Sequence, residues 1–212
     1  MNEPSNIEQP GKASILVLAC GALAREILEI FRLNGFDHIE LKCLPADLHL
    51  QPQRIPDAVE AAVRKCRSDY EEIFVAYADC GTGGLLKARC DDLGVAMIEG
   101  PHCYSFFEGN EVFAARGDEE MTAFYLTDFL VRQFDAFVWQ PMGLHRHPEL
   151  RDMIFGNYTK LVYLAQTNDD ELSRKAATCA QRLGLEYERR QTGYGDLEKV
   201  LTKVSRSGSF AG

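Results

Sequence analysis

Short apolar runs without charged residues alternate with amphipathic helical patterns along most of this chain, and this alternation constrains the fold most strongly. The runs Ile15 to Ala19 and Ile73 to Ala78 are typical of strands buried on both faces of a parallel sheet. A helical pattern over residues 22–33 follows the first run directly and ends at Asn34 and Gly35. Strand and helix units in this order favour parallel strands joined by right-handed crossovers.

The same rhythm continues through most of the sequence. Further strands are expected at residues 39–44, 95–98, 161–165 and 185–189, and further helices around 58–63 and at 85–92, 169–183 and 196–204. Residues 119–139 depart from it, because their aromatic side chains recur at helical spacing and predict one or two helices beside the functional site. We therefore expect a doubly wound α/β fold, Rossmann-like or flavodoxin-like, with a mostly parallel sheet and a helical insertion near residues 104–158.

The chain has 212 residues, of which 46% are hydrophobic, and this is enough for one domain with a sizeable core. We expect residues 14–206 to form that single domain between a disordered tail, 1–13, and a flexible tail, 207–212. The first residues are polar and lack a signal-peptide pattern. Charged residues interrupt every apolar run before the roughly 20 residues that a membrane helix needs. A soluble, cytoplasmic protein without a membrane partner is therefore predicted.

The acidic balance of the chain limits its partners further. The formal net charge is -9 and the isoelectric point is about 5.1. Such a chain repels phosphate backbones and has no basic surface for nucleic acid. We expect a small-molecule substrate, and no nucleic acid.

Three of the seven cysteines follow predicted strands, and we expect them to meet. Cys20 comes directly after the first strand, Cys80 follows the third after one intervening residue, and Cys103 lies a short loop beyond the fourth. In the common doubly wound order these strands are neighbours, so all three thiols would lie at one edge of the sheet. Without a secretory signal, thiols are kept for metal binding or catalysis more readily than for disulfides. The remaining cysteines fall within predicted strands or helices, where burial is the default: Cys43, Cys66, Cys90 and Cys179.

The chemistry of three thiols depends on how easily they ionise. Cys20 and Cys80 each open a predicted helix, whose free amides and dipole would lower the pKa of the thiol. Three thiolates could hold zinc with an open fourth position, or an iron–sulfur cluster with one open iron. Each cysteine could equally be a small buried side chain that fills a tight turn.

Other residues are weaker candidates for the same site. His102 adjoins Cys103, and His145 belongs to a His-Arg-His run before a proline, so either could act as a ligand or move protons. Gly81, Gly83 and Gly84 form a turn that could bind the anionic part of a cofactor, although the sequence lacks the Gly-Lys-Ser/Thr ending of a phosphate-binding loop.

Four segments together resemble the domain-of-unknown-function 1638 family. They are Cys20-Gly21-x-Leu23-x-x-Glu26, Cys80-Gly81-x-x-x-Leu85, Gly100-Pro101-His102-Cys103-Tyr104 and Phe124-Tyr125-Leu126-Thr127-Asp128. The resemblance covers roughly residues 15–155, and its specificity lies in the ordered set of three cysteines. Members of this family are found mainly in organisms that use corrinoid-dependent methyl transfer. The resemblance therefore implies a role in one-carbon metabolism, with a corrinoid protein or methyltransferase as partner and possible contact with a corrinoid.

Three functions remain open at this point. The leading hypothesis is a metal- or iron–sulfur-binding protein that supports corrinoid-linked methyl metabolism, either as a methyltransferase or as an accessory protein. The second is a metal-free enzyme with Cys80 or Cys20 as nucleophile and His102 or His145 as general base. The third is a non-catalytic protein that docks a corrinoid protein or methyltransferase.

Overall fold

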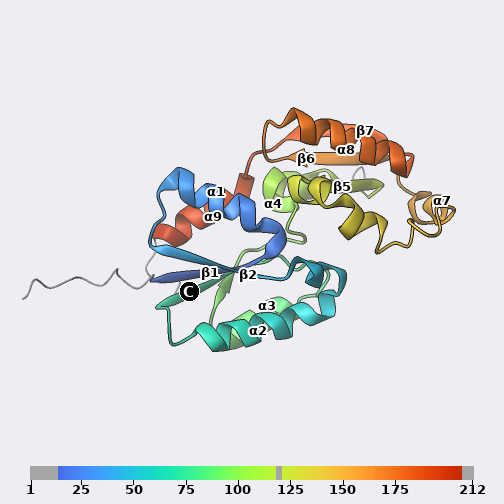
Figure 1. Cartoon of the computed structure of the whole chain (residues 1–212). Helices are drawn as coiled ribbons and strands as arrows, with labels where there is room; N and C mark the ends of the chain where they lie inside the picture. Colours follow the sequence, from blue (N-terminus) through green and yellow to red (C-terminus); the bar gives the residue numbers. More distant parts are fainter. Residues whose placement is uncertain (1–13, 118–120, 207–212) are drawn as a thin grey trace, which may run out of the picture.

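The computed structural model describes residues 14–117 and 121–206, so both predicted tails lie outside the described residues. Two parallel sheets form two lobes (Figure 1). The four-stranded lobe has the strand order β2-β1-β3-β4. Its strands are β1 (Ile15–Cys20), β2 (Ile39–Leu44), β3 (Glu72–Ala76) and β4 (Ala96–Met97). This is the arrangement in which the first, third and fourth strands are neighbours, as the sequence predicts.

Helices cover both faces of the four-stranded sheet. Those on one face are α1 (Ala24–Asn34) and α9 (Gly195–Arg206), and those on the other are α2 (Ile55–Cys66) and α3 (Leu85–Leu93). Shorter helices at the carboxyl edge are η1 (Gly21–Leu23), η2 (Ala46–Leu50), η3 (Pro52–Arg54) and α4 (Ser105–Glu108). Every residue of β1 is buried, which explains its continuous apolar sequence.

The three-stranded lobe has the strand order β5-β6-β7, again parallel. Its strands are β5 (Ala123–Thr127), β6 (Lys160–Ala165) and β7 (Glu186–Gln191). Its helical segments are α6 (Asp128–Arg132), the π-helix η5 (Asp135–Trp139), α7 (Leu150–Phe155) and α8 (Asp170–Leu183), and α5 (Asn110–Ala115) leads into it. The α/β class and the parallel strands are therefore confirmed, but the strands form two sheets instead of one.

Local signals explain where the long helices start and stop. The carboxylate of Asp169 accepts hydrogen bonds from the amides of Glu171 and Leu172, at 2.9 and 3.0 Å, and so caps α8. Gly184 ends α8 in the left-handed conformation, with a φ of 73°, and Gly35 ends α1 in the same way. These bounds agree with the helices predicted over residues 169–183 and 22–33.

The prediction of one or two helices over residues 119–139 is wrong near its start, since Ala123 to Thr127 form strand β5. Four of these five residues are buried, and the strand pairs with β6. A short apolar run fits a buried strand and a buried helix equally well, and aromatic residues favour strands. Helical structure resumes from Asp128, so the insertion near residues 104–158 is helical only in part.

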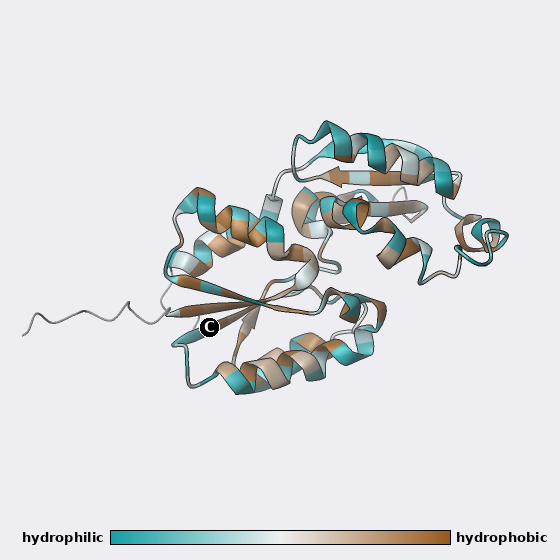
Figure 2. Ribbon diagram, in the orientation of Figure 1, coloured by the Kyte–Doolittle hydropathy of each residue, from teal (hydrophilic) through white to brown (hydrophobic). Residues whose placement is uncertain are grey.

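Each lobe has its own core, and the chain crosses between the lobes twice. The last helix, α9, returns to the four-stranded lobe and buries Leu197, Leu201 and Val204 there. Gly195 permits this return, because a Cβ at that position would collide with the carbonyl oxygens of Phe106 and Phe107. Apolar strands lie inside both lobes and polar helix faces lie outside (Figure 2). No helix in the described ranges is long and apolar enough to cross a membrane.

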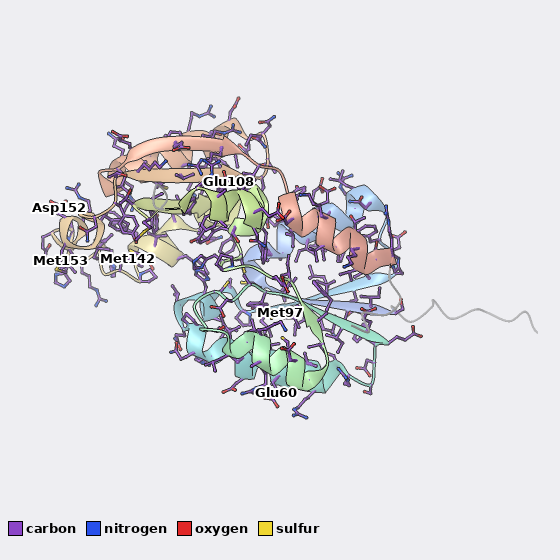
Figure 3. The ribbon with its side chains drawn as sticks, turned by 180° about the vertical axis from the view of Figure 1, so that it is seen from behind. Glu60, Met97, Glu108, Met142, Asp152 and Met153 are labelled. Carbon is purple, nitrogen blue, oxygen red and sulfur yellow. The ribbon has the colours of Figure 1, made fainter. Side chains whose placement is uncertain are left out.

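An ion-pair network links α4 to β7 where the lobes meet. Glu108 accepts hydrogen bonds from Arg116 at 2.6 Å and from Arg190 at 3.3 Å, and its side chain is only 7% exposed. Asp152, in contrast, pairs with Arg151 near the outer end of the three-stranded lobe and is 79% exposed (Figure 3). Buried ion pairs are costly to break, whereas exposed ones contribute little.

We expect Glu108→Gln to lower the free energy of unfolding by about 1–3 kcal/mol, because the amide leaves buried guanidinium groups with a weaker partner. The matched change Asp152→Asn should alter it by less than about 0.5 kcal/mol. Urea unfolding followed by circular dichroism measures both. Equal effects of the two substitutions would contradict the role given to Glu108.

Candidate functional site

The three predicted cysteines meet at the carboxyl edge of the four-stranded sheet. Cys20 is the last residue of β1, Cys80 lies four residues beyond β3, and Cys103 lies in the loop after β4. The sulfur atoms of Cys80 and Cys103 are 3.1 Å apart. Both thiols also interact electrostatically with Cys20. The sheet order therefore gathers residues that are far apart in the sequence, as predicted.

The hydroxyl group of Tyr77 lies among these thiols. Cys20, Cys103 and Cys80 all add to the effect of burial in raising its pKa. The hydroxyl is buried and donates a hydrogen bond to the sulfur of Cys20, which adds to the rise in the pKa of Tyr77 and opposes the rise at Cys20. A thiol is a weak acceptor, so this hydroxyl is held by a weaker hydrogen bond than buried hydroxyls generally make. It marks a place where a bound group could accept a hydrogen bond.

The turn that carries Cys80 is held by the carboxylate of Asp79. This carboxylate accepts hydrogen bonds from the Thr82 hydroxyl at 2.7 Å and from the amides of Gly83 and Gly84 at 3.1 and 2.7 Å. Burial opposes its ionisation, but these hydrogen bonds outweigh burial and lower the pKa of Asp79. Gly81 also contributes its amide. The glycine amides therefore donate to Asp79 in this structure, and not to the anionic part of a cofactor.

Cys80 itself has an unusual backbone conformation. Its φ is 48°, and it is the only non-glycine residue with a positive φ within the described ranges. Such a conformation costs of order 1–3 kcal/mol and persists where the surroundings enforce it. Here the amides of Asp79 and Cys80 donate to the carbonyls of Gly100 and Pro101, each at 3.0 Å. These bonds join the Cys80 turn to the Cys103 loop and hold the two sulfurs together.

The paired thiols share their protons unequally. A hydrogen bond from Cys103 and another from His49 lower the pKa of Cys80 to about 5, against the opposing effect of burial. The bond to Cys80 and burial raise the pKa of Cys103 well above its usual value. At neutral pH the pair therefore carries one proton and one negative charge, which belong to the pair as a unit.

Cys20 behaves differently from Cys80. Burial raises its pKa to about 11, and the hydrogen bond from the Ala22 amide only partly offsets this. The prediction that a helix start lowers the pKa of both thiols is therefore wrong for Cys20, since desolvation outweighs one amide. Among the remaining cysteines, Cys66, Cys90 and Cys179 are buried as expected, whereas Cys43 is exposed on the edge strand β2.

His49 is a site residue that the sequence analysis missed. It lies on η2, in the loop after β2, where an exposed imidazole interacts with the Cys80 thiol. The signal was present, because β2 is the neighbour of β1 and its carboxyl end reaches the same edge of the sheet. His49 is thus the imidazole that the structure places at the thiol pair.

The two predicted histidines occupy other places. The His102 ring stacks on Tyr104 with 4.8 Å between ring centroids, and Tyr104 stacks in turn on Tyr125 of β5 at 5.0 Å. Burial lowers the pKa of His102. His145 lies exposed in the loop before α7 and is not among the residues that line the cavity at the thiols. The structure therefore brings His102 beside the site but leaves His145 outside it.

A narrow cavity of about 40 Å³ opens beside the thiols, between the two lobes. Cys20, Cys103 and His49 line one side of it. Most of the other lining residues are apolar and come from both lobes, and they include Leu23, Phe107, Phe129, Leu130 and Phe137. The aromatic residues expected near the site are thus partly confirmed as its wall. Such a wall excludes water and strengthens electrostatic interactions at the sulfurs.

The described side chains do not already form a metal site. No group of three or more His, Cys, Asp or Glu side chains in residues 14–117 and 121–206 is arranged to hold a metal ion. Two thiolates on one tetrahedral zinc lie about 3.8 Å apart, since each Zn–S bond is about 2.3 Å long. The sulfurs of Cys80 and Cys103 would therefore have to separate by about 0.7 Å from their 3.1 Å contact.

The pKa difference within the pair predicts which thiol reacts. In metal-free protein, alkylation of Cys80 by iodoacetamide should rise with pH around 5 and then level off, because the thiolate is already formed. His49→Ala should move this midpoint upward, because it removes a hydrogen bond to the thiolate. Peptide mass spectrometry measures the rate at each cysteine, with exposed Cys43 as internal control. A midpoint for Cys80 near the ordinary value of 9 would contradict the assignment.

Comparison with known proteins identifies a family for this chain but does not identify an activity. Residues 43–201 match the model of a family described as a protein of unknown function, DUF1638, and this match covers more than half of the chain. It includes Cys80 and Cys103 and begins after Cys20. No curated protein and no solved structure matches the chain significantly. By the extent of this match, the chain belongs to the DUF1638 family.

Proposed function

We propose that Cys20, Cys80 and Cys103 bind zinc or an iron–sulfur cluster. The observation that carries this proposal is the convergence of three thiols around the Tyr77 hydroxyl, with one of them held as a thiolate. Sulfur ligands favour zinc and iron–sulfur clusters over magnesium and calcium. Cys20 and Cys103 have raised pKa values and would release their protons on binding a cation, so the metal affinity should increase with pH.

The residues around the thiols suit such a group. The Tyr77 hydroxyl donates to the Cys20 sulfur and could keep this hydrogen bond when Cys20 is a bound thiolate, which would orient the group. His49 is exposed beside Cys80 and could be a fourth ligand or hold a proton at the open position. When bound, zinc would supply Lewis acidity and hold a substrate thiol as thiolate, whereas an iron–sulfur cluster would supply electrons or an open iron.

The biological setting is proposed on sequence grounds. The resemblance to a family found with corrinoid-dependent methyl transfer supports a role in one-carbon metabolism, with a corrinoid protein or methyltransferase as partner. The narrow apolar cavity beside the thiols is compatible with a small substrate group as large as a methyl. The cavity could hold this group whether the protein itself catalyses methyl transfer or assists a methyltransferase.

A second candidate is a metal-free enzyme with Cys80 as nucleophile. Its specific support is the contact with His49, together with the low pKa and the strained backbone of Cys80. His49 takes the place that the sequence analysis gave to His102 or His145. The thiol of Cys103, with its raised pKa, would return a proton to the leaving group.

Anaerobic purification with elemental analysis distinguishes the two candidates. We expect about one zinc or a stoichiometric amount of iron per chain, with visible absorption only if a cluster is present. The triple change of Cys20, Cys80 and Cys103 to Ser should remove it, because serine is a poor ligand for these metals.

Cys179→Ser is the matched control, since Cys179 lies on α8 in the core of the three-stranded lobe, away from the edge that holds the site. It should keep the full metal content. Metal-free wild-type protein whose Cys80 is alkylated rapidly would exclude the metal proposal and favour the nucleophile. Unchanged metal content in the triple variant would exclude these cysteines as ligands.

A further inference from the structure

A second cavity, of about 230 Å³, lies between the lobes and shares no lining residue with the cavity at the thiols. The residues that line it are Arg25, Glu26 and Glu29 of α1 together with Asp128, Arg132, Thr167 and Tyr194. Its volume corresponds to roughly eight waters, at about 30 Å³ each in the liquid. It is therefore large enough for a small organic molecule, and its walls are mostly charged or polar.

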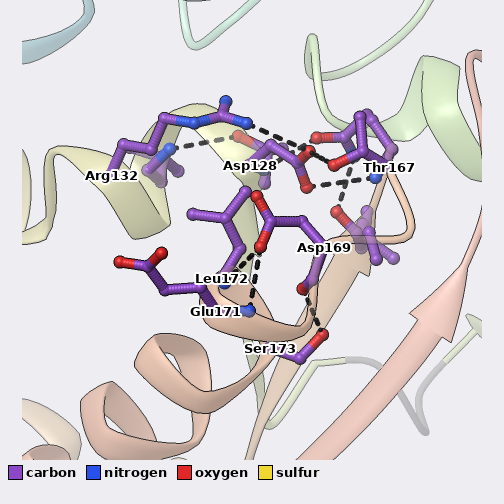
Figure 4. Close-up of polar contacts among 12 residues, drawn as sticks. Asp128, Arg132, Thr167, Asp169, Glu171, Leu172 and Ser173 are labelled. Carbon is purple, nitrogen blue, oxygen red and sulfur yellow. Dashed lines mark hydrogen bonds and ion pairs between the residues drawn. The ribbon is translucent and has the colours of Figure 1, made fainter.

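Several hydrogen bonds hold the Asp128 side chain in one position in this cavity. Its carboxylate is fully buried and accepts hydrogen bonds from the Tyr163 hydroxyl at 2.7 Å, the Gln166 amide at 3.1 Å and the Thr167 hydroxyl at 2.6 Å (Figure 4). Arg132 lies 3.5 Å from its second oxygen. The hydrogen bonds of the Asp128 carboxylate thus all come from residues of its own lobe, and Arg132 already has this carboxylate as a partner.

Glu26 is the opposite case. Its side chain belongs to α1 of the other lobe and is only 4% exposed, yet its Oε2 atom has no hydrogen-bond partner among the described residues. Burial is the main cause that raises its pKa, and Asp128 adds to it, while Arg132 and Arg25 act against it. Burying a carboxyl group without a hydrogen-bond partner destabilises the folded protein. A bound ligand that donates a hydrogen bond to the carboxyl group would remove this cost.

We propose that this cavity binds a small organic ammonium ion, whose N–H group donates to Glu26. Glu29 is paired with Arg32 at 2.6 Å, and Asp128 is held by its own lobe and by Arg132, so the unpartnered carboxylate oxygen of Glu26 is the acceptor that this cavity offers to a cation.

Hydroxyl groups complete the coordination that an ammonium ion requires. An ammonium ion donates several hydrogen bonds, and the hydroxyls of Thr167 and Tyr194 add acceptors beside Glu26. Because Glu26 and Asp128 come from different lobes, the ligand would bridge the lobes.

Ethylammonium chloride is a suitable probe, with sodium chloride and sodium acetate at equal ionic strength as salts for comparison. We expect ethylammonium to bind the full-length protein saturably and to raise its melting temperature, whereas acetate does neither. Glu26→Gln should weaken this binding at least tenfold, because the amide keeps the shape of the side chain but loses its charge. Glu71→Gln, the same change at an exposed carboxylate, should leave binding unchanged. Ligand-observed nuclear magnetic resonance and thermal unfolding measure the two effects.

The stability of the ligand-free protein gives a second, independent readout. If Glu26 serves a ligand, Glu26→Gln should raise the melting temperature by roughly 2–4 °C, because it removes a costly buried charge. A fall of that size would mean that Glu26 supports the fold, and would overturn the proposal. Equal ethylammonium binding by wild type and Glu26→Gln, no saturable binding, or preferential acetate binding would overturn it as well.

Discussion

The parallel pairing of β1 with β3, and of β3 with β4, is the constraint on which the rest of the site depends. Val17 and Ala19 of β1 pair in register with Phe74 and Ala76 of β3, and Val75 pairs with Met97 of β4. This pairing lets the three strands end at one edge, with a cysteine following each. The positions of the thiols are thus set by buried apolar strands, whose sequences permit little movement of register.

A smaller constraint refines that placement. The carboxylate of Asp79 holds the turn after β3, and this turn keeps Cys80 in a left-handed conformation that a cysteine rarely adopts. Together with the bonds from this turn to the Gly100 and Pro101 carbonyls, it brings two sulfurs within 3.1 Å. One thiol of the pair then ionises easily, and the other does not. Metal binding and nucleophilic catalysis both start from this unequal pair.

The sequence predicted the thiol edge because strand order follows from the repeated strand and helix units. It also predicted the helix ends, since capping groups such as Asp169 and Gly184 act locally. It did not predict the division into two sheets, because the run Ala123 to Thr127 carries no periodicity that separates a buried strand from a helix. His49 was missed because its role depends on which strand neighbours β1. The pKa of Cys20 is raised and not lowered because the thiol is buried, and burial cannot be inferred from the local sequence.

The two lobes meet around both cavities, so their contact matters for either function. α4 and the stacked rings of Tyr104 and Tyr125 connect the thiol edge to β5, and Glu108 connects α4 to β7. The most direct test of the central claim is X-ray absorption at the metal edge of anaerobically purified protein. Three sulfur ligands at about 2.3 Å are predicted. A shell of only nitrogen and oxygen, or protein without metal, would contradict the account.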